Sequence, residues 1–332
     1  MTGTLKNGVS VIICCYNSRE RIEKTLDFIF AQEVEGAIPW EIIIVDNAST
    51  DDTFLIAQRY LEKNKGRVGA KVVKEPLLGL KNARERGLYS AQFDFLIFVD
   101  DDNWLDLHYV SDAYFAMINN PENAMIGAFA VPVSNREFPQ WFNDVHRLYA
   151  VGRQLDKSGP LPNYTGYIYG AGMVVRKAAW EHLINSNFRF ASVDRKGKSL
   201  SGGHDVELSL ALRLAGYKVI YDDKLTLQHF IEPYRLEWPY AQKLAIASAR
   251  NFVVFCFYVY GSRGSVSLPV FGIVLFRRIL AGFMDGFFPS QPVKEFETIV
   301  SRNLARFFLT NFFNAIWYFQ ALKKFINANR SR

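Results

Sequence analysis

The stretch FLIFVDDDNW at residues 95–104 decides the fold, because apolar strand-forming residues lead directly into Asp100, Asp101 and Asp102. Three adjacent carboxylates repel one another, so they indicate either a solvated turn or a site that receives a positive charge. Magnesium and manganese ions are typically held by one or two carboxylates together with substrate phosphates. At the end of a buried strand, the three aspartates therefore favour half of a metal–phosphate site, whose other half arrives with the ligand.

Strand and helix patterns alternate through the first hundred residues. Continuous apolar runs predict buried strands at residues 9–15, 41–46, 70–74 and 94–100. Helical patterns follow the first three strands, and the first helix is predicted to open at the cap-like Asn17. This alternation predicts an α/β fold with a Rossmann-like, doubly wound, mostly parallel sheet that has helices on both faces.

Polar side chains follow three of the predicted strands. Tyr16 and Asn17 come after the first, Asp46 ends the second, and the three aspartates end the fourth. Ligands of such sheets bind beyond the carboxyl ends of the strands, so these groups are expected at one site. Asp46 precedes the next helix cap and is free to accept hydrogen bonds from a nucleobase or ribose, although a purely structural role stays open.

The second half of the chain supplies a further acidic candidate. Residues 124–133 and 167–177 are predicted strands, and GGHDVELSLALRLAGYKVIYD at 202–222 is predicted to form a glycine loop, an amphipathic helix and a strand. Asp205 lies in the first turn of this helix. Together with Glu207 it could supply a general base, or both acids could only compensate the helix dipole.

Three further side chains allow two interpretations each. Arg84, in the segment GLKNARERGL at 79–88, belongs either to a solvated helix face or to a contact with a diphosphate or a base edge. His204 and His229 are both interpreted as structural when the residues are taken alone. His229, however, follows a strand-like run and would then point at the same cleft.

Six segments together resemble family-two glycosyltransferases of the GT-A fold. In chain order they are VSVIICCYN, EIIIVDNASTDDT, GLKNARERGL, FLIFVDDDNWL, GAGMVVRK and GGHDVELSLALRLAGYK. Each is weak alone, but their order and spacing are specific. The resemblance covers residues 7–235 and implies an inverting enzyme that uses a nucleoside-diphosphate sugar.

The resemblance also implies a role for each matching residue. The donor base would be held by Tyr16, Asn17 and Asp46 with Arg84 nearby, and Asp100 and Asp101 would contact the ribose and sugar. A divalent cofactor, Mn²⁺ or Mg²⁺, would be bound by Asp102 and His229. Asp205 matches the catalytic base, and the acceptor side would include Gly172, His204 and Glu207. The chain departs from the family pattern at His204, where Glu is common, and at Glu85, where Asn is common.

The predicted organisation is a donor-binding half at 1–123, an acceptor and catalytic half of the same domain at 124–235, and a helical, aromatic-rich extension at 236–332. The segment 250–322 mixes apolar, aromatic-rich runs with a few arginines, which is compatible with peripheral membrane contact, packing on the catalytic domain or an oligomer interface. The net charge of +6 suits phosphates or an acidic membrane surface and is too dispersed for nucleic acid.

The expected location is the cytoplasm, with the inner face of the cell membrane as an alternative. The sequence begins without a signal-peptide pattern, and no uncharged apolar run reaches the roughly 18–20 residues of a spanning helix. Cys14, Cys15 and Cys256 have neither disulfide-framework nor metal-site spacing.

The leading functional hypothesis is transfer of a sugar, with a UDP-sugar as the expected donor, to a hydroxyl of a cell-surface polysaccharide or glycolipid. One alternative is a polyprenyl-phosphate glycosyltransferase, which would need less acceptor domain than residues 124–235 supply. An alternative of another class is a non-catalytic scaffold that binds nucleotide sugars. Such a scaffold would have lost its catalytic residues, whereas Asp102 and Asp205 are both present in this chain.

Overall fold

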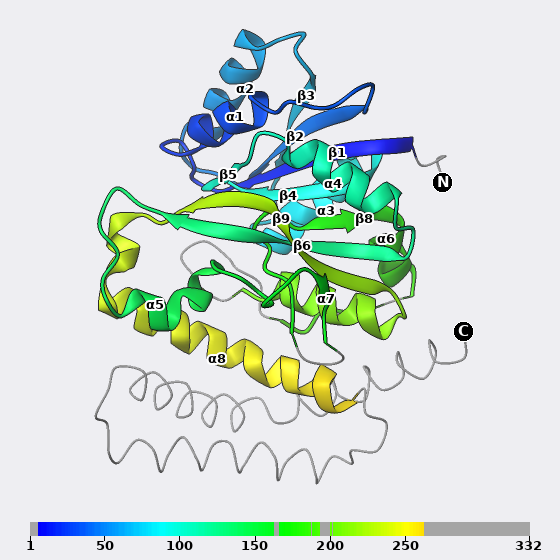
Figure 1. The fold of residues 1–332 in the computed structure, drawn as a ribbon. Coiled ribbons are helices and arrows are strands. Elements are labelled where there is room, and N and C mark those ends of the chain that lie inside the picture. Colours follow the sequence, from blue (N-terminus) through cyan, green and yellow to red (C-terminus); the bar gives the residue numbers. More distant parts are fainter. Residues whose placement is uncertain (1–5, 163–165, 187, 193–199, 201, 262–332) are drawn as a thin grey trace, which may run out of the picture.

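The computed structural model describes residues 6–162, 166–186, 188–192, 200 and 202–261, which form one nine-stranded sheet flanked by helices (Figure 1). The strands are β1 (Lys6–Cys15), β2 (Trp40–Asn47), β3 (Gly69–Glu75), β4 (Phe93–Asp100), β5 (Asn103–Leu105), β6 (Asn123–Val133), β7 (Gly159–Pro160), β8 (Val174–Arg176) and β9 (Lys218–Phe230). The helices are α1 (Ile22–Phe30), α2 (Thr53–Lys63), α3 (Leu80–Ser90), α4 (Tyr109–Ile118), α5 (Phe142–Val145), α6 (Lys177–Asn185), α7 (His204–Leu214) and α8 (Trp238–Gly261). Two short 3-10 turns are η1 (His146–Tyr149) and η2 (Pro233–Leu236).

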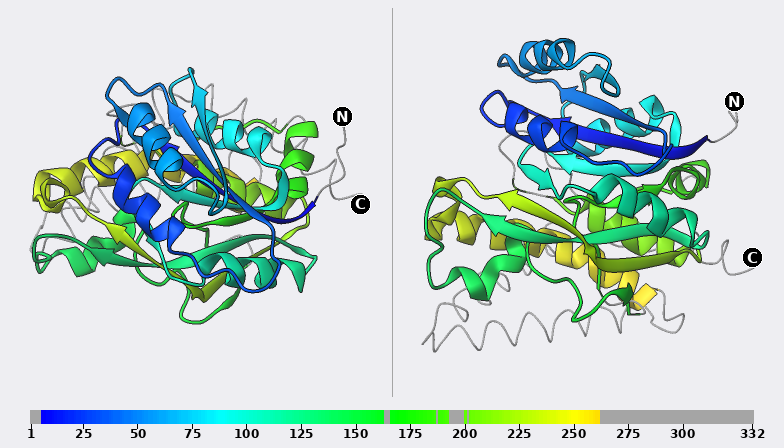
Figure 2. Two further views of the ribbon diagram at one scale, coloured as in Figure 1. Left: turned by 90° about the horizontal axis from the view of Figure 1, so that it is seen from above. Right: turned by 45° about the horizontal axis from the view of Figure 1, so that its top comes forward.

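The sheet is parallel in its first half and mixed in its second. Its strand order is β3-β2-β1-β4-β8-β6-β9-β5, with β7 paired to β9. β1 pairs in parallel with β2 and β4, whereas β8 runs antiparallel to both β4 and β6. Figure 2 shows the strands of the first hundred residues, blue to cyan, at one end of the sheet and the later green strands toward the other. The predicted α/β class with a mostly parallel sheet is confirmed.

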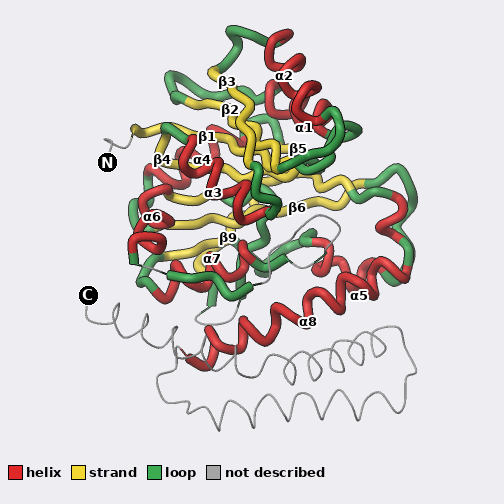
Figure 3. Tube along the Cα trace, turned by 180° about the vertical axis from the view of Figure 1, so that it is seen from behind, coloured by secondary structure: helices red, strands yellow, loops and turns green. Residues whose placement is uncertain are grey.

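Alternate residues of β1 belong to two different cores. Ile12 and Cys14 pack in the layer that contains α3, α6 and α7, whereas Val11 and Ile13 pack with α1, α2 and α4. Figure 3 shows α3, α6 and α7 in front of the strands. A strand covered on both faces is apolar at nearly every position, which explains the near-continuous run in the sequence.

The strand register brings the polar strand ends to one edge of the sheet. Cys14 pairs with Asp100 and Cys15 with Asp46, so the ends of β1, β2 and β4 coincide. In the second half of the sheet, β5 pairs with β9, and Asn103 lies opposite His229. The amide of Phe230 also donates a hydrogen bond to the Asp102 carbonyl at 2.8 Å. Segments far apart in the sequence therefore meet beyond the carboxyl end of β4.

Two of the predicted elements are corrected by the structure. Helix α1 begins at Ile22 and not at Asn17, because Asn17 has a left-handed backbone with φ of 51° and a turn follows in which Ser18 accepts from Arg21 and Ile22. The predicted strand at 167–177 is reduced to β8, and α6 starts at Lys177. Gly170, which precedes β8, lines the cavity described below.

Helix α8 packs against α7, η1 and η2, at the opposite end of the sheet from α1 and α2 (Figure 1). The aromatic extension predicted from residue 236 is therefore helical as far as Gly261, and the rest of the proposed membrane-contact segment 250–322 lies outside the described residues. Within the described part of the chain, no helix combines the length and apolar content that crossing a bilayer requires.

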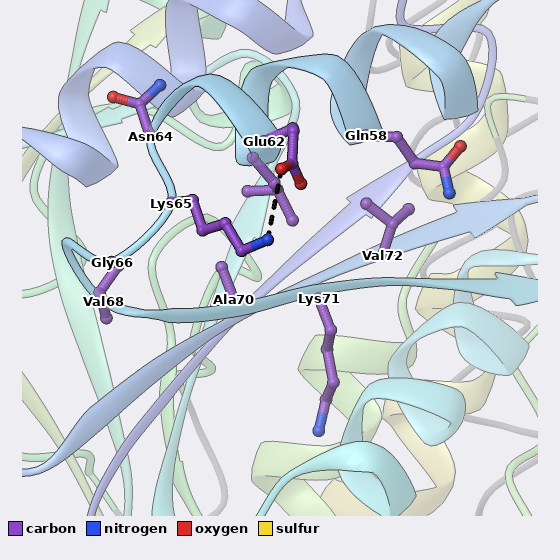
Figure 4. A pocket seen from close by; sticks show the side chains of 10 residues that line it. Gln58, Glu62, Asn64, Lys65, Gly66, Val68, Ala70, Lys71 and Val72 are labelled. Atoms are coloured by element: carbon purple, nitrogen blue, oxygen red, sulfur yellow. Dashed lines mark hydrogen bonds and ion pairs between the residues drawn. The ribbon is translucent and has the colours of Figure 1, made fainter.

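A surface hollow of about 400 Å³ lies between the end of α2 and the edge strand β3 (Figure 4). Lys65 crosses it toward Glu62 at 3.3 Å, and Lys71 lies on its other side. The hollow adjoins the first residues of β3, where the parallel strands begin, whereas Asp46 and Asp100 lie where the strands end. It is therefore separate from the polar strand ends.

Candidate active site

A cavity of about 460 Å³ lies at the carboxyl ends of the parallel strands. This volume falls in the range of small-molecule sites, which is about 300–1,000 Å³. Its walls come from the ends of β1, β2 and β4, from α3, from the start of α7, and from β9 and η2. The predicted site residues that line it are Tyr16, Arg84, Asp100, Asp101, Asp102, Asp205 and His229.

Asp101 and Asp102 each have a cationic partner. Arg21 donates to Asp101 Oδ2 at 2.7 Å, and Arg235 donates to Asp102 Oδ2 at 3.1 Å. Ser18 also donates to Asp101. Burial by itself lowers the pKa of the Arg21 guanidinium, but the Asp101 carboxylate reverses this and raises it above its ordinary value. The repulsion expected among the aspartates is therefore already relieved by two arginines.

Asp102 and His229 have a separation that suits two ligands of one metal ion. His229 Nε2 lies 3.5 Å from Asp102 Oδ1, and both side chains are almost completely buried. Two adjacent ligands of an octahedral ion, each about 2.1 Å from it, lie roughly 3 Å apart. Among the described residues, no group of three or more His, Cys, Asp or Glu side chains is placed to hold a metal ion. The pair therefore fits an ion that takes its other ligands from the substrate and water.

Asp205 and Arg84 approach each other across Gly170. A Cβ atom on Gly170 would lie 2.3 Å from Arg84 Nη2 and 3.1 Å from Asp205 Oδ2. Arg84 is only 2% exposed, and within the described residues its buried Nη1 has no hydrogen-bond partner. The Asp205 side chain is half-buried and lines the cavity. Both side chains thus lie close to Gly170, the arginine near the predicted catalytic base and not in an ion pair with it.

Glu207 and His204 lie outside the cavity lining. Residues two apart on a helix are roughly 200° apart around its axis, so Glu207 and Asp205 face different ways. Glu207 is fully buried and accepts hydrogen bonds from the amides of Ala191 and Ser192 at 2.8 and 2.7 Å and from the Tyr258 hydroxyl at 2.6 Å. These bonds give Glu207 a structural environment and not an acceptor-facing one.

His204 is enclosed by the rings of Trp180 and Phe190, at centroid distances of 5.5 and 4.3 Å. Burial, reinforced by the nearby charges of Arg84 and Lys81, holds its pKa well below the ordinary value. The imidazole ring is therefore neutral and packs against two aromatic rings, which holds the first residue of α7 in place.

Asn17, Asp46 and Gly172 also lie outside the cavity lining. Asn17 Oδ1 accepts from the Thr50 amide at 2.8 Å and so ties two loops together. Asp46 is 5% exposed, and within the described residues its buried Oδ1 has no partner. Gly172 has φ of 68°, and a Cβ there would lie 2.3 Å from Leu227. Its carbonyl accepts from the Tyr109 hydroxyl at 2.6 Å, which is a packing role.

The sequence of the site is matched by a known family. A profile described as "Glycosyl transferase family 2" matches residues 10–183, just over half of the chain. The chain belongs to glycosyl transferase family 2. The match includes β1, β4 and the three aspartates and ends before Asp205.

Two curated relatives share part of this family 2 sequence. The "Putative teichuronic acid biosynthesis glycosyltransferase TuaG" of Bacillus subtilis is 41% identical over 97 residues, which are 29% of this chain and 36% of the relative. The "Poly(ribitol-phosphate) beta-N-acetylglucosaminyltransferase TarP" of Staphylococcus aureus is 26% identical over 132 residues, 40% of this chain and 39% of the relative. The matches therefore span well under half of these proteins.

Two solved structures share the fold over most of the family 2 chain. TarS of Staphylococcus aureus has a TM-score of 0.52 at 18% identity, covering 86% of this chain and 44% of that one. The mannosyltransferase PcManGT of Pyrobaculum calidifontis, solved with GDP-Man and Mn²⁺, has a TM-score of 0.52 at 16% identity, covering 99% and 87%. At these identities the similarity establishes the GT-A architecture and nothing finer.

The family 2 motifs do not mark several residues that complete the cavity. Arg21 and Arg235 are cationic partners of the aspartates. Aromatic side chains form another part of the cavity lining, the aromatic wall: Tyr149, Tyr167, Tyr169, Tyr234 and Phe255. The high aromatic content of the sequence is the only signal that pointed to this wall. Cys14 also lines the cavity, but burial raises the pKa of its thiol to about 12, so it stays protonated.

Substitution of Gly170 by alanine should displace the Arg84 side chain near Asp205. The new methyl would displace the guanidinium, which is the far end of a flexible side chain, so we expect kcat to fall about tenfold with less than about 1 kcal/mol lost in stability. Gly69→Ala is the control, because a Cβ there meets nothing within 4 Å. Steady-state kinetics and thermal melts measure both effects, and an unchanged kcat in Gly170→Ala would contradict this arrangement.

Proposed function

We propose that the chain transfers a glycosyl group from a nucleoside-diphosphate sugar to an acceptor hydroxyl, with inversion at the anomeric carbon. The observation that carries this proposal is the meeting of Asp102 and His229 with Asp205 in one cavity. One side offers groups for a metal-bound diphosphate and the other offers a carboxylate beside an aromatic wall. Family 2 membership supports the same reaction class.

The donor is assigned to the part of the cavity formed by residues 1–123. Tyr16 follows β1 and lies at the end of the sheet where Asn47 and Asp100 also line the cavity. We propose uridine as the first base to test. One structure of TarS contains UDP-GlcNAc and PcManGT contains GDP-Man, so both nucleotides are suitable probes.

Asp102 and His229 are the residues that would hold Mn²⁺ or Mg²⁺ when the donor is bound. Such an ion neutralises the charge that develops on the departing nucleoside diphosphate. Arg235 lies against the same carboxylate, so a guanidinium is available on that side of the diphosphate. A site that is preorganised in this way lowers the free energy of the transition state.

Asp205 is proposed to be the general base. Its carboxylate takes the proton of the acceptor hydroxyl as the hydroxyl oxygen bonds to the anomeric carbon, and the bond from that carbon to the diphosphate oxygen breaks on the opposite face. The proton ends on Asp205 and the electron pair of the broken bond leaves with the nucleoside diphosphate. One displacement of this kind inverts the configuration.

The acceptor is assigned to the aromatic wall supplied by the later part of the chain. Tyr167 stacks on Phe255 with ring centroids 5.9 Å apart, and Tyr234 is 62% exposed. Aromatic faces with adjacent hydroxyls suit sugar rings, which present both C–H groups and hydroxyls. We therefore propose a glycan or the sugar part of a glycolipid as acceptor.

A thermal-shift experiment tests the donor site. A ligand that binds only the native state raises the melting temperature, by an amount that grows with its concentration relative to Kd. We expect UDP with Mn²⁺ to stabilise the protein by about 3 °C or more, GDP to do so less, and EDTA to remove most of the effect. Asp102→Ala should lose the part that depends on Mn²⁺. If no nucleoside diphosphate shifts the melting temperature with or without metal, the proposed function is wrong.

A further inference from the structure

Arg235 is a buried cation that already pairs with the metal-binding aspartate. It lies in η2 with its side chain 9% exposed, and its Nη1 donates to Asp102 Oδ2 at 3.1 Å. Its backbone carbonyl accepts from the Tyr149 hydroxyl at 2.8 Å, and its guanidinium lies over the Tyr240 ring at 5.6 Å. These contacts fix the arginine against Asp102 in the donor-free protein.

The pair leaves both carboxylate oxygens of Asp102 engaged. Oδ2 accepts from Arg235. Oδ1 accepts from the side-chain amide of Asn103 at 3.1 Å and lies 3.5 Å from His229 Nε2. Burial by itself lowers the pKa of Arg235, but the Asp102 carboxylate outweighs it and raises the pKa above the ordinary value. The arginine therefore remains charged at any physiological pH.

We propose that Arg235 is a resident counter-ion of Asp102, which competes with the divalent metal in the donor-free enzyme and transfers to the donor diphosphate when the nucleotide binds. This inference rests on the proposed function, because it assigns the diphosphate to this cavity. It makes metal and nucleotide binding strongly synergistic. Arg235 thus pairs with Asp102 in the donor-free protein and with the diphosphate in the donor complex.

Charge and geometry support a transfer of this kind. An ion that approaches Asp102 must share the carboxylate with a guanidinium only 3.1 Å away, and like charges at such a distance repel strongly in a buried site. A diphosphate supplies oxygens that match the planar fork of an arginine. Within the described residues, the buried Nε of Arg235 has no hydrogen-bond partner, so a further acceptor would satisfy it.

Arg21 provides a matched control in the same cavity. It is also an arginine on one of the three aspartates, at 2.7 Å from Asp101 Oδ2, and it also lines the cavity. Loss of Arg21 removes the same charge without removing a contact to Asp102. Comparison of the two arginines therefore separates direct competition from the general field of the site.

The test is a titration with Mn²⁺, in which electron paramagnetic resonance measures free Mn²⁺, without nucleotide and with saturating UDP. The proteins are the full chain, Arg235→Gln, Arg235→Met, Arg235→Lys and Arg21→Gln. Without nucleotide, we expect either neutral variant at Arg235 to lower the Kd for Mn²⁺ about tenfold. The ratio of the two Kd values, without and with UDP, should fall by a similar factor, because binding linkage is reciprocal.

The charge-preserving Arg235→Lys should stay within about threefold of the wild type in both quantities, and Arg21→Gln should change the Kd for Mn²⁺ less than threefold. If the neutral variants bind Mn²⁺ alone no more tightly than the wild type, or if Arg21→Gln has the same effect, the inference is wrong while UDP binding still supports the proposed function. If the wild type binds no UDP, the proposed function fails, and the titrations with Mn²⁺ alone still decide the competition. Melting curves show whether Arg235→Gln and Arg235→Met are folded. If neither is folded, Arg235→Lys decides alone: because it keeps the positive charge, a Kd for Mn²⁺ that is tenfold lower than in the wild type would show that the charge does not compete with the metal.

Discussion

Asp205→Asn should lower kcat by about 10²–10⁴-fold and leave donor binding intact, because the amide cannot accept the proton of the acceptor hydroxyl. The side chain lies in the first turn of α7, is half-buried and faces the cavity. Asparagine has nearly the same shape, so the packing of the turn is preserved. The loss should therefore appear in the chemical step and not in the melting temperature.

The measurement combines transfer assays at saturating donor and acceptor with a separate Kd for the nucleotide. Asp112→Asn is the matched control, because Asp112 also lies in the first turn of a helix, α4, and does not line the cavity. We expect it to change kcat less than twofold. If Asp205→Asn kept at least a third of the wild-type kcat, the base would have to be sought elsewhere on the cavity wall.

The buried strands of this protein could be predicted from the sequence for a simple physical reason. The central parts of β1, β2 and β4 are covered on both faces, so nearly every position there is apolar and the run is visible without any alignment. The parallel arrangement then requires their carboxyl ends to meet, which is why Tyr16 and the three aspartates could be assigned to one site. Asp205 was predicted as a possible base from its place at a helix start after two glycines, and the family resemblance favoured that role; the structure places it in the cavity lining.

The remaining parts of the site depend on contacts that local sequence does not encode. Asp102 and Arg235 are 133 residues apart, and nothing in the pattern around either residue indicates the other. The same holds for Arg84 and Asp205, which both come close to Gly170 only once α3 and α7 are packed. The resemblance to the family implied that Glu207 lies on the acceptor side as the second acid of the helix start, whereas the helical turn directs it into the core.

Glu207→Ala should cost about 4 kcal/mol in the free energy of unfolding, which is the largest stability effect that we predict. The side chain is fully buried, and its removal leaves the amides of Ala191 and Ser192 and the Tyr258 hydroxyl without their acceptor. Each buried donor left in this way costs about 1–3 kcal/mol. The melting temperature should therefore fall by roughly 8 °C.

Because Glu207 joins α7, α8 and the 191–192 segment, its loss should also loosen the turn that carries Asp205. Tyr258→Phe removes only one of the three donors, so we expect it to cost about 1 kcal/mol. Glu62→Ala is the control, since this glutamate is 74% exposed and forms an ion pair with Lys65 on the surface. The melting temperature of this variant should differ from that of the wild type by roughly 1 °C or less. Denaturant unfolding of the three variants measures the order of these effects. Equal stability of Glu207→Ala and Glu62→Ala would mean that the buried carboxylate does not hold α7 and α8 together, and that Asp205 is positioned by the packing of His204 and Val206 alone.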